Sequence, residues 1–321
     1  MSEVKPYLLY TPFPRLETLQ DLSNATHLSL GLLYKLSKLS CCYYRVYSIP
    51  KPSGGSRTIA EPAKSMKAVQ SWILVNILRD LTLPPQAMGF RRGRNILRNA
   101  QAHEKNKYLL SLDIDNFFPS IKYNMVYTVF RSLGYNKHIC HVLTSLCTFN
   151  SSLPQGGVTS PALSNLVCIK MDHRISGYCG PRNIVYTRYA DDMVFSSMNA
   201  NRLVGLYSAV KGIIENECFK LNNKKTRYMG PKRRRKVTGL VIGNGKAGIG
   251  RQEERRIRAS IYSLIVKSKG TIDTEAVTRL RGYFCYIKSV DSERQNRLSG
   301  YTERLCLKHN RPELRQALLH R

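Results

Sequence analysis

Two pairs of aspartates, each beside short β-prone runs, constrain the fold of this chain more than any other feature. Asp113 and Asp115 stand at the end of the apolar run KYLLSLDI, and Asp191 and Asp192 lie in YADD, between the two runs of residues 184–197. Two carboxylates about 4 Å apart repel each other by about 4 kcal/mol at an effective dielectric constant of 20. Such clustering is costly unless a cation neutralises it, and carboxylate oxygens suit Mg²⁺ or Mn²⁺. A lone Asp-Asp pair is more often a turn or a cap, but two clusters at strand ends favour a shared metal centre.

The excess of basic residues favours a polyanionic partner. Lys plus Arg number 51 and Asp plus Glu 21, so the formal net charge is 51 − 21 = +30. A charge of this size works against folding, and nucleic acid is the first candidate partner, with an anionic membrane surface second. Residues 224–321 are the most basic, with 25 basic and 8 acidic side chains. Acidic clusters on so basic a chain predict a two-metal phosphoryl-transfer centre.

Cysteine use and hydropathy predict a cytoplasmic protein that has no membrane partner. Residues 1–15 contain three prolines and no apolar segment of the length that a secretory signal needs. A long stretch without Lys, Arg, Asp or Glu, residues 139–169, contains prolines and glycines that rule out a membrane-spanning helix. Nine cysteines without C-x-x-C spacing argue against a zinc site or a disulfide framework.

Hydrophobic periodicity divides the chain into an α+β body, residues 1–250, and a basic helical domain, residues 251–321. In the body we expect a hairpin at 43–61 around a Pro-Ser-Gly-Gly turn. The other expected elements of the body are two short helices within 16–39, helices at 64–81, 123–133, 162–176 and 200–216, strands at 107–114 and 184–197, and a second hairpin at 236–250. In the helical domain, Ser292 and Gln295 predict a capping box for the last long helix.

The acidic turn YADD resembles the catalytic box of reverse transcriptases, and three further segments support the resemblance. LDIDNFF resembles the first catalytic strand, with Asp113 as metal ligand and Phe118 as the aromatic residue that excludes a 2′-hydroxyl. SLPQGGVTSPALSNL resembles the loop and helix in which Gln155 and Gly156 pack against the incoming nucleotide and the templating base. LNNKKT resembles the later lysine motif, in which Lys225 protonates the leaving pyrophosphate; the adjacent Lys224 leaves open that both only bind phosphate.

The resemblance covers residues 45 to about 245 and implies a right-hand polymerase architecture. Fingers and a palm with an antiparallel sheet are expected, followed by an α-helical thumb. The implied cofactor is a pair of Mg²⁺ ions, with Mn²⁺ as the alternative. The implied catalytic residues are Asp113, Asp191, Asp192 and Lys225, the first three of them metal ligands, and the implied nucleotide-binding residues are Lys51, Arg57, Ile114, Phe118, Gln155 and Gly156. Two cations flanking the hairpin turn suit a triphosphate, although solvated hairpin charge is the alternative.

Two short motifs resemble signatures of bacterial retron reverse transcriptases. Asn99 to His103 fit N-A-x-x-H, and Val237 to Gly239 fit V-T-G; alone, the first is typical of packing and the second of a strand fragment. About 70 residues follow the expected palm, which is enough for a three-helix thumb and too few for an RNase H, integrase or maturase domain. The implied nucleic-acid-binding residues are Asn99, His103, Arg233, Arg234, Arg235, Val237, Thr238, Gly239, Arg255, Arg258 and Arg281.

The resemblance implies a specific activity and a specific set of partners. Retron enzymes are RNA-directed DNA polymerases that bind a cognate noncoding RNA and take dNTP substrates. They start DNA synthesis at the 2′-hydroxyl of an internal guanosine, and the product is branched multicopy single-stranded DNA (msDNA). An effector protein and a role in antiphage defence are also implied. The alternatives are a scaffold that binds the RNA–DNA hybrid and an effector, a group II intron-type enzyme, and a DNA-binding regulator built on residues 16–39.

Overall fold

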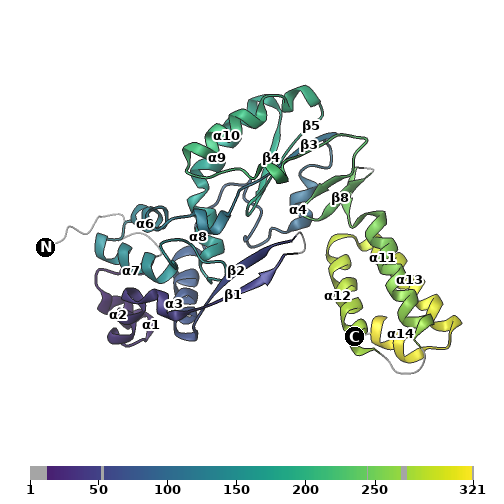
Figure 1. The fold of residues 1–321 in the computed structure, drawn as a ribbon, viewed down its shortest axis with the longest axis horizontal. Helices are drawn as coiled ribbons and strands as arrows, with labels where there is room; N and C mark the ends of the chain where they lie inside the picture. The colour runs from purple at the N-terminus through teal and green to yellow at the C-terminus, as the bar shows by residue number, and fades with distance from the viewer. Residues whose placement is uncertain (1–12, 52–53, 244, 269–272, 320–321) are drawn as a thin grey trace.

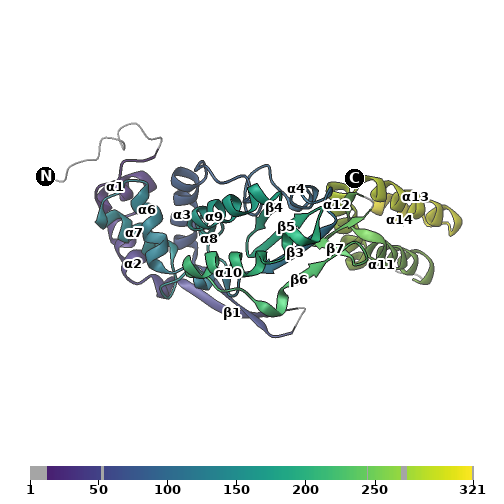
Figure 2. The same ribbon diagram turned by 90° about the horizontal axis from the view of Figure 1, so that it is seen from above.

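The computed structural model describes residues 13–51, 54–243, 245–268 and 273–319. A helical body with a projecting hairpin, a central sheet flanked by helices, and a C-terminal helical domain make up the molecule (Figure 1). Seen from above, these parts follow one another along the long axis, with the sheet in the middle (Figure 2). Among the described helices, none has the length and apolar character needed to cross a membrane.

The helical body forms because short amphipathic helices bury one face each. Leu22 of α1 (Leu19–Thr26) and Leu33 and Leu36 of α2 (Leu30–Lys38) are fully buried, which confirms the two short helices expected in this segment. The other helices of the body are α3 Lys64–Ile73, which continues as the π-helical turn Leu74–Leu78, α5 Phe117–Ser120, α6 Tyr123–Ser132 and α7 Lys137–Cys147.

The predicted hairpin is confirmed and projects from the helical body (Figure 1). β1 (Tyr44–Pro50) pairs antiparallel with β2 (Ser56–Pro62), and Ile49 lies opposite Arg57. Pro52 and Ser53 of the expected turn lie outside the described residues.

The central sheet is antiparallel, with the strand order β4-β5-β3-β6. Its strands are β3 Tyr108–Asp113, β4 Val185–Tyr189, β5 Asp192–Ser197 and β6 Arg227–Met229. Successive side chains of a strand point to opposite faces. Leu110 and Leu112 therefore enter the core shared with the helical body, whereas Leu109 enters a second core shared with the C-terminal domain. Because both faces are covered, the sheet is held rigidly between two cores.

Three helices after the body pack into the first core. They are α8 Ser160–Val167, α9 Ile169–Cys179 and α10 Leu206–Asn216. The helical pattern expected at 162–176 is confirmed, with an interruption at Cys168 that divides it into α8 and α9. The helix expected at 200–216 is also divided: a 3₁₀ turn precedes Gly205, whose φ of 75° is the left-handed conformation that glycine tolerates.

The C-terminal part differs in detail from the expectation. The second hairpin is a three-stranded meander, and the domain after it has four α-helices in its described residues, not three. The elements are β7 Arg235–Val237, β8 Leu240–Gly243, β9 Lys246–Gly248, α11 Gly250–Tyr262 with a π-helical continuation Ser263–Lys267, α12 Thr274–Val290, α13 Ser292–Lys308 and α14 Pro312–Leu319. The capping box on Ser292 is wrong, because Asp291 is the cap and accepts a hydrogen bond from Arg294 N at 3.2 Å.

Candidate active site

Strand pairing brings two of the predicted catalytic carboxylates together. Asp113, the last residue of β3, lies opposite Asp192, the first residue of β5, in the antiparallel register. Asp191 precedes Asp192 in the tight turn between β4 and β5, and its carbonyl accepts a hydrogen bond from Ile114 N at 3.0 Å. Ala190, before the two aspartates, has a φ of 58°. The aspartates therefore come from a strand end and an adjoining turn that are hydrogen-bonded to each other.

The environment of these carboxylates disfavours their negative charge. Burial, together with the neighbouring charges of Asp191 and Asp113, raises the pKa of Asp192 to about 6. Burial also raises the pKa of Asp113, although a hydrogen bond from Lys225 opposes this effect. The Lys225 ammonium lies 2.7 Å from Asp113 Oδ1, and this contact raises the pKa of the lysine. The cluster is thus an electrostatically strained site that a further cation would relieve.

The donor set fits a divalent cation, but its geometry is not that of a closed cage. Within the described ranges, no group of three or more His, Cys, Asp and Glu side chains is arranged to hold a metal ion. The cation that engages Asp113 is instead Lys225. All the candidate ligands are carboxylate oxygens, the ligands that Mg²⁺ prefers. The raised pKa values of Asp113 and Asp192 are the observation that supports the fit, because each carboxylate carries negative charge that its neighbours do not fully neutralise.

A pocket of about 410 Å³ opens at this end of the sheet. Asp113, Asp192 and Lys225 line it together with Thr238 and Gly239 of the V-T-G motif. The remaining lining residues are Ile96, Ser111, Tyr189, Val194, Arg227, Met229 and Lys236.

Two of these pocket residues, the cations Arg227 and Lys236, were missed by the sequence analysis. Arg227 follows Lys225 by two positions and pairs with Ser111 of β3. Ser111 lies two residues before Asp113 in β3 and so on the same face of the sheet, and recognition of the short strand β6 would therefore have placed Arg227 on the side that bears Asp113.

The loop carrying Gln155 and Gly156 packs directly against the hairpin. The carbonyl of Gln155 accepts a hydrogen bond from Ala60 N of β2 at 2.8 Å. Gly156 has a φ of 122°, and a Cβ atom there would lie 2.8 Å from the carbonyl oxygen of Ala60. Only glycine fits this close approach. Lys51 and Arg57 are exposed near the tip of the same hairpin, so strand β2 links the two groups of predicted nucleotide-binding residues.

An aromatic cluster adjoins the catalytic turn. The ring of Phe118 is half-buried and lies 6.1 Å, centroid to centroid, from that of Phe90, which in turn lies 6.4 Å from Tyr189. Phe118 is thus joined through Phe90 to the strand that leads into the aspartates. Ile114 is different: its side chain is 1% exposed, so the expectation of a nucleotide contact by this side chain is wrong, and only its main chain remains available for one.

The two polar residues that define the N-A-x-x-H motif, Asn99 and His103, point into the interior of the protein. His103 is fully buried, with Nδ1 2.7 Å from Ser196 Oγ and Nε2 2.8 Å from Thr187 Oγ1, and burial lowers its pKa to about 3. Asn99, in α4 (Ile96–Gln101), is also fully buried and donates to Thr238 Oγ1 at 3.3 Å. The expected nucleic-acid contact is therefore wrong for both side chains.

The V-T-G motif is divided between the core and the surface. Val237 is 1% exposed and belongs to the second core, so the expected nucleic-acid contact is wrong for this side chain too. Thr238 is half-buried and Gly239 is exposed, and both reach the pocket that holds the aspartates. The motif thus joins α4 to the catalytic pocket through the Asn99–Thr238 hydrogen bond.

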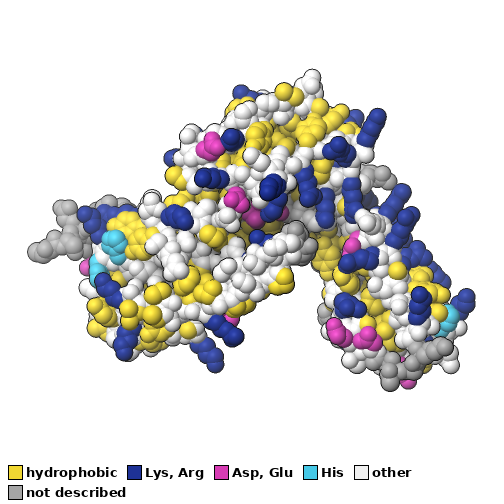
Figure 3. Space-filling model, viewed as in Figure 1, with side chains coloured by type: hydrophobic (Ala, Val, Ile, Leu, Met, Phe, Trp, Pro, Cys, Tyr) yellow, Lys and Arg dark blue, Asp and Glu magenta, His cyan; other side chains and the backbone are white. Residues whose placement is uncertain are grey.

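The predicted basic residues differ in their surroundings. Five of them are exposed: Arg233, Arg234, Arg255, Arg258 and Arg281. Arg234 donates to Gln252 Oε1 at 2.5 Å, and the guanidinium of Arg258 lies 4.3 Å from the centroid of the Tyr301 ring. Arg235 is half-buried and donates to the carbonyl of Asn106, so its guanidinium is partly engaged inside the protein. Lys and Arg side chains gather on the right of the sheet region and over the C-terminal domain, beside a hollow that separates this domain from the hairpin (Figure 3).

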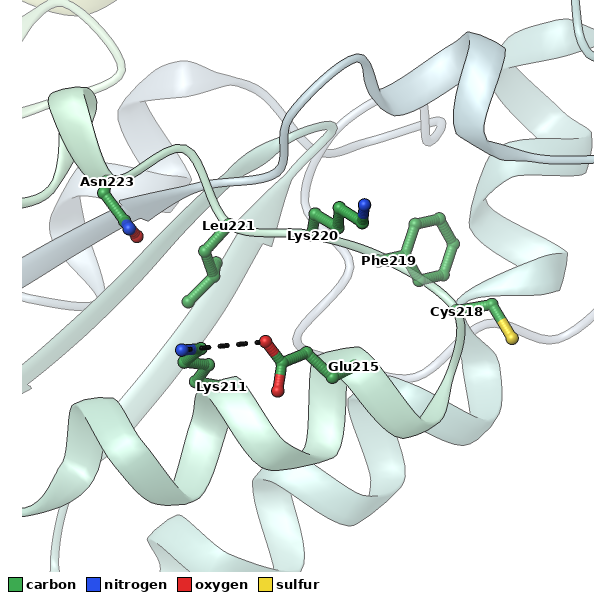
Figure 4. Close-up of a pocket in the computed structure, with 7 residues that line it drawn as sticks. All are labelled: Lys211, Glu215, Cys218, Phe219, Lys220, Leu221 and Asn223. Carbon is green, nitrogen blue, oxygen red and sulfur yellow. Dashed lines mark ion pairs between the residues drawn. The ribbon is translucent and has the colours of Figure 1, made fainter.

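A second pocket, of about 430 Å³, lies next to the end of β3 but contains none of the three aspartates that are predicted to be catalytic. Lys211 and Glu215 of α10 form an ion pair on one side of it, and Cys218 to Leu221 and Asn223 line the other side (Figure 4). The carbonyl of Lys220 accepts a hydrogen bond from Asp115 N at 2.8 Å. The lining segment therefore supports the end of β3 from outside the active site.

One protein family and several known proteins resemble this chain. The family described as reverse transcriptase (RNA-dependent DNA polymerase) matches residues 49–242. The retron Ec86 reverse transcriptase of Escherichia coli is 40% identical over 306 residues, which cover 95% of this chain and 94% of that protein. The retron Mx162 and Mx65 reverse transcriptases of Myxococcus xanthus are 32% and 30% identical; the matches cover 86% and 89% of this chain, and 66% and 71% of those proteins. The chain therefore belongs to the reverse transcriptase family, and within it to the retron reverse transcriptases, which are RNA-directed DNA polymerases.

Proposed function

We propose that Asp113, Asp191 and Asp192 bind two Mg²⁺ ions and that DNA synthesis takes place in the pocket beside them. The observation that carries this proposal is the meeting of the buried Asp113 with the half-buried Asp192, both with raised pKa values, and a third carboxylate at the adjoining turn. Reverse transcriptases as a family use divalent metal ions, which activate the attacking hydroxyl and stabilise the leaving pyrophosphate when bound. Lys225, 2.7 Å from Asp113, is positioned to donate a proton to the pyrophosphate or to bind it.

The hairpin and the loop beside it form the proposed site for the incoming dNTP. Because Gly156 has no side chain, its loop packs closely against the main chain of β2, and the hydrogen bond from Ala60 N to the carbonyl of Gln155 holds the loop beside the hairpin. Arg57, with Lys51 as the weaker candidate, supplies exposed positive charge for the triphosphate. Phe118 is the proposed steric gate against the 2′-hydroxyl of ribonucleotides. These roles make the hairpin and the helical body the fingers of the right-hand polymerase, and the central sheet its palm.

The template of this enzyme is RNA, and we propose that the C-terminal domain, residues 251–321, is a thumb that binds it. Arg255, Arg258 and Arg281 are exposed on its helices, and no ion pair joins any of them to an acid among the residues that the structure describes. Such cations suit the phosphate backbone of a duplex. Arg256 and Arg297 are also exposed on helices of this domain, but they form ion pairs with Glu253 and Glu293 and so contribute less free positive charge.

The retron relationship supports a specific product. We propose that the enzyme primes at the 2′-hydroxyl of an internal guanosine in a cognate noncoding RNA and makes branched msDNA, and that it acts with an effector protein in antiphage defence. The test is to purify the protein with its bound nucleic acid and to treat the sample with RNase and with debranching enzyme. A DNA strand released only by debranching supports the proposal. Bound RNA without attached DNA, and no extension with Mg²⁺ and dNTPs, would instead indicate a scaffold.

A substitution tests the catalytic assignment separately. Asp191→Asn removes one charge from the turn and keeps the shape of the side chain. We expect it to abolish DNA synthesis while RNA binding stays nearly intact, measured by primer extension and by filter binding of the same preparation. Unchanged synthesis would contradict the role proposed for the three aspartates.

A further inference from the structure

A fully buried ion pair lies directly behind the catalytic turn. Arg188, in β4, and Asp172, in α9, are both 0% exposed. Arg188 Nε donates to Asp172 Oδ1 at 2.9 Å and Nη2 donates to Oδ2 at 2.6 Å, which is the two-pronged geometry that an arginine forms with a carboxylate. The hydroxyl of Tyr186 donates to the same Oδ1 at 2.7 Å. One edge of the guanidinium is thus fixed by a carboxylate on a neighbouring helix.

The other edge of the guanidinium faces the catalytic turn. Arg188 Nη1 donates to the carbonyl of Ala190 at 3.3 Å and to Asn165 Oδ1, from α8, at 3.1 Å. Asn165 is itself fully buried, and its Nδ2 donates to the carbonyl of Gly89 at 2.8 Å. One side chain therefore links α9, α8, the segment at Gly89 and the residue that precedes the two catalytic aspartates.

The turn needs such support because its backbone is unusual. Ala190 has a φ of 58°, a left-handed conformation that residues with a Cβ atom disfavour. Gly89 packs so closely that a Cβ atom there would lie 2.8 Å from Ala190 N. The main chain of Arg188 is also hydrogen-bonded to this segment, since its carbonyl accepts from Met88 N at 2.8 Å. The direction of the carboxylates of Asp191 and Asp192 depends on this conformation.

We propose that Arg188 is a positioning residue for DNA synthesis. Its guanidinium is anchored to Asp172 and donates to the carbonyl of Ala190, and it thereby fixes the turn that carries Asp191 and Asp192. Asn165 completes the arrangement by joining the same guanidinium to Gly89. A lysine at position 188 keeps the charge opposite Asp172 but has one nitrogen in place of three, so it cannot bind the carboxylate and the turn together. This inference rests on the proposed catalytic role of Asp191 and Asp192.

The test compares Arg188→Lys with Tyr186→Phe. Both remove hydrogen bonds from the Asp172 network, but only the first removes the contact with Ala190. We expect Arg188→Lys to lower kcat about 10- to 100-fold, as small misplacements of reacting groups do. The KM for dNTP should stay within about 3-fold of the original, because the hairpin and the loop of Gln155 and Gly156 bind the dNTP. Tyr186→Phe should keep kcat within about 3-fold of the original even where its melting temperature falls.

A readout other than activity comes from amide hydrogen exchange, which reports local opening of the backbone. The peptide covering residues 188–195 should lose protection in Arg188→Lys and keep it in Tyr186→Phe. If Arg188→Lys does not fold, Asn165→Ala takes its place and should reduce kcat and the protection of residues 86–90. A folded Arg188→Lys, or Asn165→Ala in its place, with normal kcat and normal protection would overturn the inference. An active Asp191→Asn would refute the proposed function, whereas an inactive Asp191→Asn with a fully active Arg188→Lys would refute only the positioning role.

Discussion

Replacing Asp192 by asparagine should make the metal-free protein more stable, although it removes a catalytic residue. Burial and the charges of Asp191 and Asp113 raise the pKa of Asp192 from 3.8 to about 6. The folded state therefore binds a proton more tightly than the unfolded state, and above pH 6 the ionised carboxylate costs folding free energy. The difference between 3.8 and about 6 corresponds to about 3 kcal/mol at 1.36 kcal/mol per pH unit. Because the side chain is partly exposed to solvent, we expect about 1 to 2 kcal/mol.

The assay is thermal unfolding of the wild type and Asp192→Asn in EDTA at pH 7.5 and pH 4. For a chain of 321 residues, 1 to 2 kcal/mol corresponds to a rise in Tm of about 1.5 to 3 °C. The rise should be present at pH 7.5 and nearly absent at pH 4, where Asp192 is protonated in the folded protein. Asp80→Asn, which removes an exposed carboxylate far along the sequence from the cluster, is the control and should shift Tm by less than about 1 °C.

Adding Mg²⁺ at pH 7.5 extends the same experiment. An ion bound by the aspartates stabilises the folded state by mass action. The wild type should therefore gain more Tm than Asp192→Asn, and the difference between them should shrink or reverse. An Asp192→Asn variant that is equally or less stable than the wild type in EDTA at pH 7.5 would refute the idea that the carboxylates repel one another in the folded protein.

Three further predictions concern single side chains. Gly156→Ala should lower the free energy of unfolding by about 1 to 3 kcal/mol in urea titrations, because of its φ of 122° and the contact with Ala60, whereas Gly177→Ala, with open space around it on α9, should not destabilise the protein. His103→Ala should lower the free energy of unfolding by about 2 to 4 kcal/mol, because it leaves two buried hydroxyls without their partner. The Kd for RNA of the folded protein should not change, and an increased Kd would instead indicate a direct contact between His103 and RNA. Phe118→Ala should raise incorporation of ribonucleotides relative to deoxyribonucleotides by about 10-fold or more in single-nucleotide extension. An unchanged ratio would contradict the role of Phe118 as the steric gate.

Local pattern predicted the elements that place the catalytic groups. The strand at 108–113 and the two strands around YADD follow from β-prone runs with turn residues between them, and the antiparallel pairing of β3 with β5 then brings Asp113 opposite Asp192. The hairpin at 44–62 follows in the same way. In each case the β-prone residues lie within one short segment, so nothing distant in the chain is needed to recognise the strand.

The errors arose where distant parts of the chain decide the environment. His103 is 84 residues before Thr187 and 93 before Ser196, and nothing in the helical pattern around it predicts that both hydroxyls lie against its ring. The buried Arg188–Asp172 pair was missed for the same reason, because an arginine beside a catalytic turn looks in sequence like a residue that faces substrate. The cap of α13 was a local error: Asp291 and Ser292 are both good caps, and the position of Gly248, close to the Asp291 carboxylate, favours the aspartate.

The raised pKa of Asp192 indicates that nearby basic residues do not neutralise the cluster of Asp113, Asp191 and Asp192. Lys225 contacts Asp113, and Arg227 lowers the pKa of Asp192, yet that pKa remains at about 6. If nearby cations outweighed both the burial of Asp192 and the charges of Asp191 and Asp113, its pKa would lie at or below 3.8. Arg255, Arg258 and Arg281 of the C-terminal domain stand instead on exposed helix faces, where a phosphate backbone can reach them. Neutralisation of the three aspartates is therefore left to bound cations. Their negative charge opposes folding when no metal ion is bound, and the same charge favours the binding of metal ions.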